Sequence, residues 1–291
     1  MLLQDHFKAG ASSTSNIFLA SFPKSGTTWH RALIFATINR TLHDVASPHH
    51  PLLTTGPHDC FPYLQLDAYL YNNNMHEHRD HDHHSRSLMS HDDRDHDGDG
   101  STNIATTTRL FATHKPYSLL PKSVTTNNIG GSKFVYICRN PKDVCISSWN
   151  FMNKLKSQVC TPLSLEEAFE LFCQGFSDYG PFWDHVLGFL KASLEFPEKI
   201  LFLKYEDLKK EPDVQVKRLA EFLGQPFSLE EESQGVVQQI IKLCGFENLS
   251  GLEERSSGDW KNFFTEDMAK RMDQITDDKL NGSVLTFYTD A

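Results

Sequence analysis

The sequence predicts an α/β protein in which a parallel sheet is covered by helices on both faces. Three short apolar runs, at 16–22, 133–138 and 200–205, are each followed by a turn signal and a helical pattern. A fourth strand candidate, at 108–113, lies between the first two along the chain. Strands that alternate with helices favour parallel pairing, because each crossover helix returns the chain to the same end of the sheet. A length of 291 residues suits one large domain of this class or two small ones.

The composition excludes several classes of protein. The chain is 39% hydrophobic and 23% charged with a net charge of −10, whereas a general nucleic-acid binder needs a basic face. No apolar run approaches 18 residues, so we expect no membrane span, and residues 1–10 lack the apolar core of a secretory signal. The six scattered cysteines form no C-x-x-C pair, which is typical of free thiols in a reducing compartment. We therefore expect a cytoplasmic protein that binds neither nucleic acid nor membrane.

Helices are indicated by apolar periodicity together with start and stop signals. Pro141 suits the first turn of a helix, and Ser164 followed by Glu167 forms a capping box. Gly224 ends another amphipathic segment. The proline-containing stretch 48–71 is expected to be loop with short helices. The predicted helices cover 27–39, 143–153, 165–174, 182–196, 212–223 and 228–243.

A low-complexity segment at 76–100 interrupts this pattern. Between His76 and Asp99 there are seven Asp and one Glu against three Arg, a net charge of −5, and seven of the 15 His of the chain. So few apolar residues cannot offset the entropy lost on ordering. We expect a disordered surface insertion within the domain. Loose binding of Zn²⁺ or Ni²⁺ by its His and Asp side chains is the alternative interpretation.

The first motif with chemical meaning is Pro23-Lys24-Ser25-Gly26-Thr27-Thr28-Trp29, between the first strand and the first helix. Backbone N–H groups at a helix N-terminus converge, and the helix dipole favours an anion there. Gly26 allows close approach of the backbone, Lys24 adds a positive charge, and Thr27 and Thr28 add hydroxyl donors. The spacing differs from G-x-x-x-x-G-K-[ST], so this is not a Walker A loop. The motif predicts a site for a phosphate-like group.

Two further positions lie at predicted strand ends. Arg139 ends a central strand at its carboxyl end, where open α/β sheets bind ligands, and Ser147 lies two turns into the following helix. His114 follows the strand candidate at 108–113. A neutral imidazole near pH 7 can remove a proton from a hydroxyl group. A solvated rim Arg and a structural His are the alternatives for residues in such positions.

Several motifs in a shared order resemble the plant-style cytosolic sulfotransferases from Met1 to Phe287. They are PKSGTTW, THKPYSLLPKS, YICRNPKDVCIS, GPFWDHVLGF, LFLKYEDLK and LCGFENL. The resemblance implies a P-loop-like parallel sheet flanked by helices, formed by a single domain over 1–291. It also implies transfer of a sulfuryl group from 3'-phosphoadenosine 5'-phosphosulfate to a hydroxyl of a small molecule, such as a flavonoid, steroid or jasmonate. Sulfuryl carries less charge than phosphoryl, so no metal is expected to be required.

The same resemblance assigns roles to individual residues. Lys24 to Thr28 would hold the 5'-phosphosulfate, and Arg139 with Ser147 would hold the 3'-phosphate. His114 would be the catalytic base, and Lys24 would also stabilise charge on the leaving oxygen. Trp29 and Phe246 would cover the two faces of the adenine, and Tyr205 would approach its edge. The implied donor-binding residues are Lys24, Ser25, Gly26, Thr27, Thr28, Trp29, Arg139, Ser147, Tyr205 and Phe246.

The sequence departs from the family pattern in places that bear on activity. The chain begins late relative to the family, so part of the acceptor wall is expected to be missing, and 76–100 replaces a short loop. The family's Arg-Lys-Gly before Gly-Asp-Trp is absent, because Glu253 and Glu254 stand where Arg and Lys belong and a preceding segment is deleted. Two carboxylates beside a 3'-phosphate should weaken donor binding. A non-catalytic relative is therefore the main alternative.

Two further questions are decided by missing motifs. A nucleotide kinase of related fold is disfavoured, because the chain has neither a Walker A pattern nor an evident carboxylate site for Mg²⁺. The C-terminal dimer motif of animal relatives is only partly present at 261–266. We therefore predict no oligomeric state.

Overall fold

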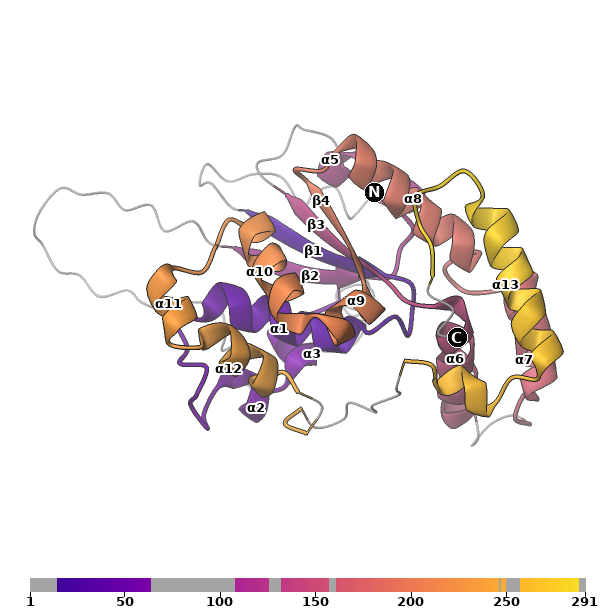
Figure 1. The fold of residues 1–291 in the computed structure, drawn as a ribbon, viewed down its shortest axis with the longest axis horizontal. Helices are drawn as coiled ribbons and strands as arrows, with labels where there is room; N and C mark the ends of the chain where they lie inside the picture. Colours follow the sequence, from indigo (N-terminus) through magenta and orange to yellow (C-terminus); the bar gives the residue numbers. More distant parts are fainter. Residues whose placement is uncertain are drawn as a thin grey trace, which may run out of the picture.

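The computed structural model describes residues 15–63, 108–125, 132–156, 161–245, 247–249 and 257–287. At its centre is a parallel sheet in the order β2-β1-β3-β4, as Figure 1 shows. Its strands are β1 (Asn16–Ser21), β2 (Arg109–Thr113), β3 (Lys133–Cys138) and β4 (Ile200–Lys204). The predicted α/β fold and its four strands are confirmed, and β4 ends one residue earlier than expected.

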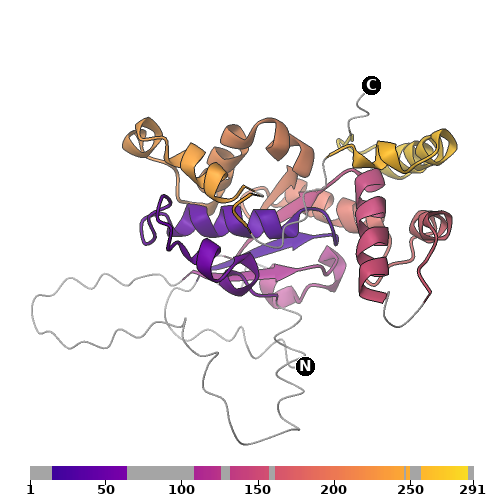
Figure 2. The same ribbon diagram turned by 90° about the horizontal axis from the view of Figure 1, so that it is seen from below.

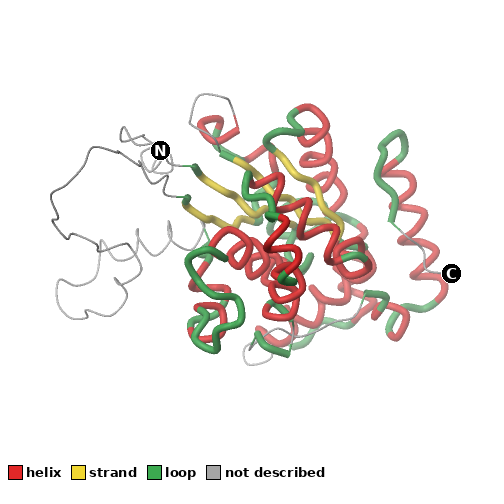
Figure 3. The backbone as a smooth tube through the Cα atoms, turned by 60° about the vertical axis from the view of Figure 1, so that its left-hand side comes forward, coloured by secondary structure: helices red, strands yellow, loops and turns green. Residues whose placement is uncertain are grey.

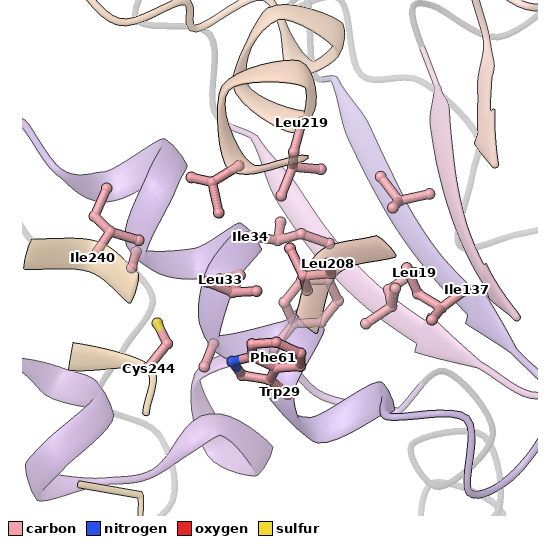
Figure 4. Packing of buried hydrophobic residues seen from close by; sticks show 14 of the residues in the cluster. Leu19, Trp29, Leu33, Ile34, Phe61, Ile137, Leu208, Leu219, Ile240 and Cys244 are labelled. Atoms are coloured by element: carbon pink, nitrogen blue, oxygen red, sulfur yellow. The ribbon is translucent and has the colours of Figure 1, made fainter. Parts of the chain in front are cut away.

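Alternate residues of each strand face opposite cores. In β1, Leu19 belongs to a cluster that α1 (Thr27–Asn39), α9 (Tyr205–Lys210), α10 (Pro212–Leu223) and α12 (Val236–Leu243) cover. Phe18 belongs to one that α7 (Leu165–Cys173), α8 (Phe182–Glu195) and α13 (Glu266–Leu280) cover. Figure 3 shows the strands running through the middle of the helices. Figure 4 shows the first cluster, in which Leu19 of β1 and Ile137 of β3 approach Leu208. Burial on both faces explains why β1, β3 and β4 are mainly apolar runs, whereas the edge strand β2 begins with the exposed Arg109.

Five predicted helices are confirmed to within a few residues at their ends, whereas α9 (Tyr205–Lys210) and α13 (Glu266–Leu280) were not predicted. Ser164 forms the expected capping box, with its side chain and that of Glu167 each bonded to the other's backbone N–H. The principal helices are α1 (Thr27–Asn39), α6 (Pro141–Lys156), α7 (Leu165–Cys173), α8 (Phe182–Glu195), α9 (Tyr205–Lys210), α10 (Pro212–Leu223) and α13 (Glu266–Leu280). Shorter ones are α2 (Pro51–Thr54), α3 (Pro57–Cys60), α5 (Lys122–Thr125), η1 (Tyr117–Leu119) and η2 (Asp259–Asn262).

One helix prediction was wrong. The segment 228–243 forms two helices, α11 (Leu229–Ser233) and α12 (Val236–Leu243). Gly235 separates them with a φ of 70°, in the left-handed region that interrupts helical geometry. In Figures 1 and 2, α11 and α12 lie at the opposite end of the molecule from α6 and α7.

The predicted insertion at 76–100 lies outside the described residues, as do Phe246, Glu253 and Glu254. Among the helices that are described, none is both long and apolar enough to cross a bilayer.

Candidate active site

The predicted phosphate-binding motifs meet at the carboxyl edge of the sheet. Because β1 and β3 are parallel neighbours, the loop after β1 and the residue after β3 lie at the same edge. The Arg139 guanidinium donates a 3.4 Å hydrogen bond to the Lys24 carbonyl oxygen and lies 4.7 Å from the centre of the Tyr205 ring. The predicted juxtaposition of Lys24 and Arg139 is therefore confirmed, and Tyr205 joins them from the end of β4.

The backbone of the loop between β1 and α1 depends on Gly26. This residue has a φ of 93° and precedes α1 without a side-chain cap. A Cβ atom here would lie 2.5 Å from Cδ2 of Tyr205, so only glycine fits. Lys24 also has a left-handed φ, of 66°, which costs a non-glycine residue roughly 1–2 kcal/mol. The N-terminal end of α1 is thus available to an anion, as the dipole argument requires.

Two hydroxyl groups of the motif, those of Thr27 and Ser25, differ in their hydrogen bonding. Thr27 Oγ1 lies 2.7 Å from Ser21 Oγ, so this hydroxyl is held by the end of β1. Ser25 is fully buried, and no described residue hydrogen-bonds its Oγ. Leaving such a group unsatisfied costs about 1–3 kcal/mol. A ligand oxygen in the loop would relieve this cost, so the residues present fit a phosphate or sulfate group.

Lys24 extends from the loop toward two other groups. Its Nζ lies 4.3 Å from the ring centre of Phe151, a half-exposed residue of α6. Its charge also contributes to lowering the pKa of His114. The structure therefore brings the two predicted catalytic residues into electrostatic contact, although they lie ninety positions apart in the sequence.

Trp29 and Tyr205 form an aromatic wall behind the loop. Their ring centroids are 5.5 Å apart at 71°, and both side chains are almost fully buried. Figure 4 shows Trp29 beside Phe61 in the core cluster. Both residues thus contribute to the core as well as to the candidate site.

A buried carboxylate that sequence reasoning missed organises the Arg139 side of the site. Asp143 pairs with Arg139 at 4.0 Å and accepts hydrogen bonds from the backbone N–H groups of Gly258 and Trp260, at 2.9 and 3.2 Å. Burial raises the pKa of this carboxyl, opposed by these three partners. Ser147 is buried on the same helix, α6. Asp143 therefore connects the Gly-Asp-Trp turn to the start of α6. Its position within the Arg-Asn-Pro-Lys-Asp motif is the sequence feature that could have identified it.

His114 lies directly after β2 with both ring nitrogens bonded. Nδ1 lies 2.8 Å from the Ser21 carbonyl oxygen, and Nε2 lies 2.8 Å from the Tyr63 hydroxyl oxygen. Burial lowers the pKa of His114 to about 4, so the ring is neutral at pH 7. Because a carbonyl only accepts, the proton is on Nδ1, and Nε2 carries the lone pair. The imidazole is therefore in the protonation state that a general base needs.

Four residues around His114 were not predicted from the sequence. His185 Nε2 lies 3.0 Å from the His114 carbonyl oxygen, and Tyr136 bonds the other ring nitrogen of His185 at 2.8 Å. Tyr63 bonds His114 directly, and the Arg31 guanidinium lies 3.7 Å from the Tyr63 ring centre. These residues come from segments that are distant in sequence, so no local pattern identified them.

No metal centre accompanies these side chains in the part of the chain that the model describes. There, no group of three or more His, Cys, Asp or Glu side chains could hold a metal ion. The groups at the sheet edge are instead the cations of Lys24 and Arg139, the hydroxyls of Ser25 and Thr27, and the His114 imidazole. This set suits an anionic ligand and proton transfer.

Comparison with known proteins agrees with this geometry. A family model described as a sulfotransferase domain matches residues 14–284. The chain is 42% identical to flavonol 4'-sulfotransferase of Flaveria chlorifolia, covering 98% of this chain and 84% of the relative. It is 40% identical to cytosolic sulfotransferase 15 of Arabidopsis thaliana, covering 99% and 77% of the two chains.

Solved structures give the same result. The crystal structure of a putative steroid sulphotransferase from Arabidopsis thaliana matches with a TM-score of 0.68 and 36% identity, over 98% of this chain and 83% of that one. Retinol dehydratase, solved with androsterone and the inactive cofactor PAP, matches with a TM-score of 0.61 at 22% identity, over 98% and 87%, which supports the fold. The chain therefore belongs to the sulfotransferase family, among its plant-type cytosolic members.

Proposed function

We propose that this enzyme transfers a sulfuryl group from 3'-phosphoadenosine 5'-phosphosulfate to a hydroxyl group of a small molecule. The main support is the juxtaposition of a neutral, half-buried His114, held by Ser21 at the end of β1, with the cationic loop around Lys24 that follows this strand. A base for the acceptor hydroxyl and a cation for the leaving group are the two requirements of this transfer. Both are present in a chain of the sulfotransferase family.

The donor would bind along the carboxyl edge of the sheet. The loop would hold the 5'-phosphosulfate, with Ser25 supplying the buried hydroxyl that lacks a described partner. Arg139 and Ser147 would hold the 3'-phosphate. The adenine would lie between Trp29 and Phe246, with Tyr205 at its edge. The donor residues are therefore Lys24, Ser25, Gly26, Thr27, Thr28, Trp29, Arg139, Ser147, Tyr205 and Phe246.

The acceptor is proposed to be a hydroxylated molecule of flavonoid, steroid or jasmonate type. Relatives named as flavonol sulfotransferases, at 41–42% identity, favour a flavonol as the first acceptor to test.

No metal is required in this scheme, so activity should survive a chelator such as EDTA. We also propose a single domain over 1–291 with a disordered insertion at 76–100, located in the cytoplasm as its relatives' names indicate. It is proposed to bind neither nucleic acid nor membrane.

Calorimetric titration with 3'-phosphoadenosine 5'-phosphate, the desulfated product, tests the donor assignment before any acceptor is known. Saturable binding, followed by transfer of labelled sulfate to a panel of flavonols, steroids and hydroxylated jasmonates, would support the proposal. Glu253 and Glu254, in place of Arg and Lys, favour a second candidate, a folded relative that no longer holds the donor. Absence of nucleotide binding by a folded chain would support this non-catalytic candidate and overturn the enzyme proposal.

A further inference from the structure

The lone pair of the candidate base is already occupied. The Nδ1–H of His114 donates to the Ser21 carbonyl oxygen, so Nε2 is the remaining acceptor on the ring. The Tyr63 hydroxyl donates to this nitrogen at 2.8 Å. A neutral imidazole has one lone pair in the ring plane, so an acceptor hydroxyl cannot reach Nε2 while Tyr63 holds it.

Tyr63 is fixed in this position by its surroundings. The Arg31 guanidinium lies 3.7 Å from its ring centre, a close cation–π contact. Its backbone bridges to Ala112 of β2, two residues before His114, and the Ala112 N–H bonds the Pro62 carbonyl oxygen at 2.9 Å. Displacing the tyrosine would break these contacts and leave its hydroxyl to be paired elsewhere.

Arg31 is itself an unusual residue. It is fully buried on α1, its Nη1 lies 2.7 Å from His58 Nδ1, and none of the described residues bonds its Nε or Nη2. No carboxylate among the described residues pairs with Arg31, and a buried guanidinium without such a partner is costly. Its positive charge would stabilise a negative charge that formed beside it during the reaction. Tyr63 is the group against which it is stacked.

We propose that Tyr63 is a catalytic residue that relays the acceptor proton to His114. The acceptor O–H bond breaks as its proton passes to Tyr63 Oη, and the Tyr63 proton passes to His114 Nε2, which becomes imidazolium. The freed acceptor oxygen forms a bond to sulfur, and the bond from sulfur to the bridging oxygen breaks. That oxygen leaves with the 5'-phosphate of the nucleotide, stabilised by Lys24. Imidazolium then loses its proton to water, which restores the starting state.

Arg31 acts in this scheme as a positioning residue. It holds the ring in place, and its charge favours the partial phenolate that forms as the two protons move. The pKa of Tyr63 is raised by burial, and the charge of Arg31 and a hydrogen bond from Thr27 oppose that rise. Arg31, the positioning residue of this scheme, is thus among the groups that favour loss of the phenolic proton.

The inference rests on the proposed sulfuryl transfer. Replacing Tyr63 by phenylalanine tests the relay. Tyr63→Phe removes one oxygen and keeps the ring on Arg31. We expect kcat to fall by about 10²-fold for an aliphatic alcohol, the usual contribution of a positioned proton-transfer group. For 4-nitrophenol, which ionises readily, we expect a loss under about tenfold, because little base assistance is needed. Affinity for 3'-phosphoadenosine 5'-phosphate should be unchanged in a calorimetric titration.

Tyr117→Phe is the matched control. This tyrosine packs edge-on against Phe189 of α8, at a centroid distance of 5.4 Å, and should tolerate loss of its hydroxyl with all acceptors. Equal or faster turnover by Tyr63→Phe would overturn the relay while sulfuryl transfer stands. A loss that is the same for alcohols and 4-nitrophenol would also overturn it, since it would indicate a structural role. If the wild-type chain transfers no sulfate to any acceptor, both proposals fall.

Discussion

The two sides of the candidate site are built in different ways. The donor side uses residues that are close in sequence, from Pro23 to Trp29 and from Arg139 to Ser147, placed together because β1 and β3 are neighbours. The acceptor side joins His114 to Tyr63, Arg31 and His185, which come from four separate segments. Motifs with a local geometry can thus be recognised from the chain alone, whereas a network of single residues cannot.

Separate substitutions on the two sides should have separable effects. His114→Ala removes the base and should lower kcat by about 10²–10⁴-fold, with nucleotide affinity intact, because the proposed role of this residue is to take up the acceptor's proton and not to bind the nucleotide. Lys24→Ala should lower both kcat and nucleotide affinity, because the same cation binds the phosphosulfate and stabilises the leaving oxygen. Steady-state kinetics and calorimetry with 3'-phosphoadenosine 5'-phosphate measure the two effects. Equal losses of nucleotide affinity in both variants would contradict this division of roles.

The shape of the donor loop can be tested at Gly26. Gly26→Ala places a Cβ 2.5 Å from the Tyr205 ring on a backbone with a φ of 93°, so the loop must shift. We expect at least about tenfold weaker nucleotide binding, and a free energy of unfolding lower by more than the roughly 1–2 kcal/mol of left-handed strain. Gly282→Ala is the control, because its φ is 78° but no atom lies within 4 Å of the added Cβ. Similar behaviour of the two variants would mean that contact with Tyr205 is unimportant.

Glu253 and Glu254 are assigned to the 3'-phosphate site from the sequence, because they lie outside the described residues. Their negative charge at this site can be tested by substitution. Replacing them by Arg and Lys should tighten nucleotide binding about tenfold or more, because each charge-assisted contact contributes about 1.5–3 kcal/mol. The gain should be larger at low salt, where screening is weaker. Nucleotide affinity that stays constant across a salt series would show that the deleted segment matters through shape, and the His114 assignment would be unaffected.

The parallel pairing of β1, β3 and β4 could be predicted because each of these buried strands is an apolar run followed by a helix, whereas the position of β2 beside β1 could not. The break at Gly235 could not, because a glycine within a helical pattern is often tolerated and its left-handed φ follows from packing. Asp143 and Tyr63 were missed for a related reason. Each acquires its role from a partner far along the chain, Gly258 in one case and His114 in the other.

Buried histidines give the folded protein a characteristic response to acid. Burial lowers the pKa of His30, His114 and His185 to about 4, from the ordinary 6.5. Between these values the unfolded chain binds protons that the folded chain does not, so stability falls as the pH drops from 6.5 toward 4. For each of these histidines, the free energy of unfolding falls by up to about 1.4 kcal/mol per pH unit in this range.

Denaturant unfolding at several pH values from 7.5 to 5 measures this slope. His30→Leu should flatten it by about one group's share, because His30 is fully buried and its Nδ1 bonds the Gly26 carbonyl oxygen rather than a charged group. An unchanged slope in this variant would mean that His30 titrates normally. The pH at which kcat falls gives the corresponding test for His114 on the acceptor side, where we expect the base to stay neutral down to about pH 5.

The smallest effect is expected from deleting 76–100. This segment separates Tyr63 from His114 in sequence, so it tests whether the acceptor side depends on the insertion. The proposal of a disordered segment predicts a melting temperature that is nearly unchanged. Shortening the 44-residue connection between Tyr63 and Thr108 by 25 residues would favour folding by about 0.7 kcal/mol through loop closure alone.

A large fall in melting temperature on this deletion would show that the segment packs against the domain. Kinetics of the same variant separate the two sides of the site. If the insertion borders the acceptor, the KM for a flavonol should change while affinity for the nucleotide does not, because Lys24 and Arg139 belong to loops after β1 and β3. A change in nucleotide affinity alone would place the insertion on the donor side, and the contrast drawn between locally and distantly assembled halves would then fail. Repeating the measurement with added Zn²⁺ or Ni²⁺ tests loose metal binding, which should shift the melting temperature of the full chain only.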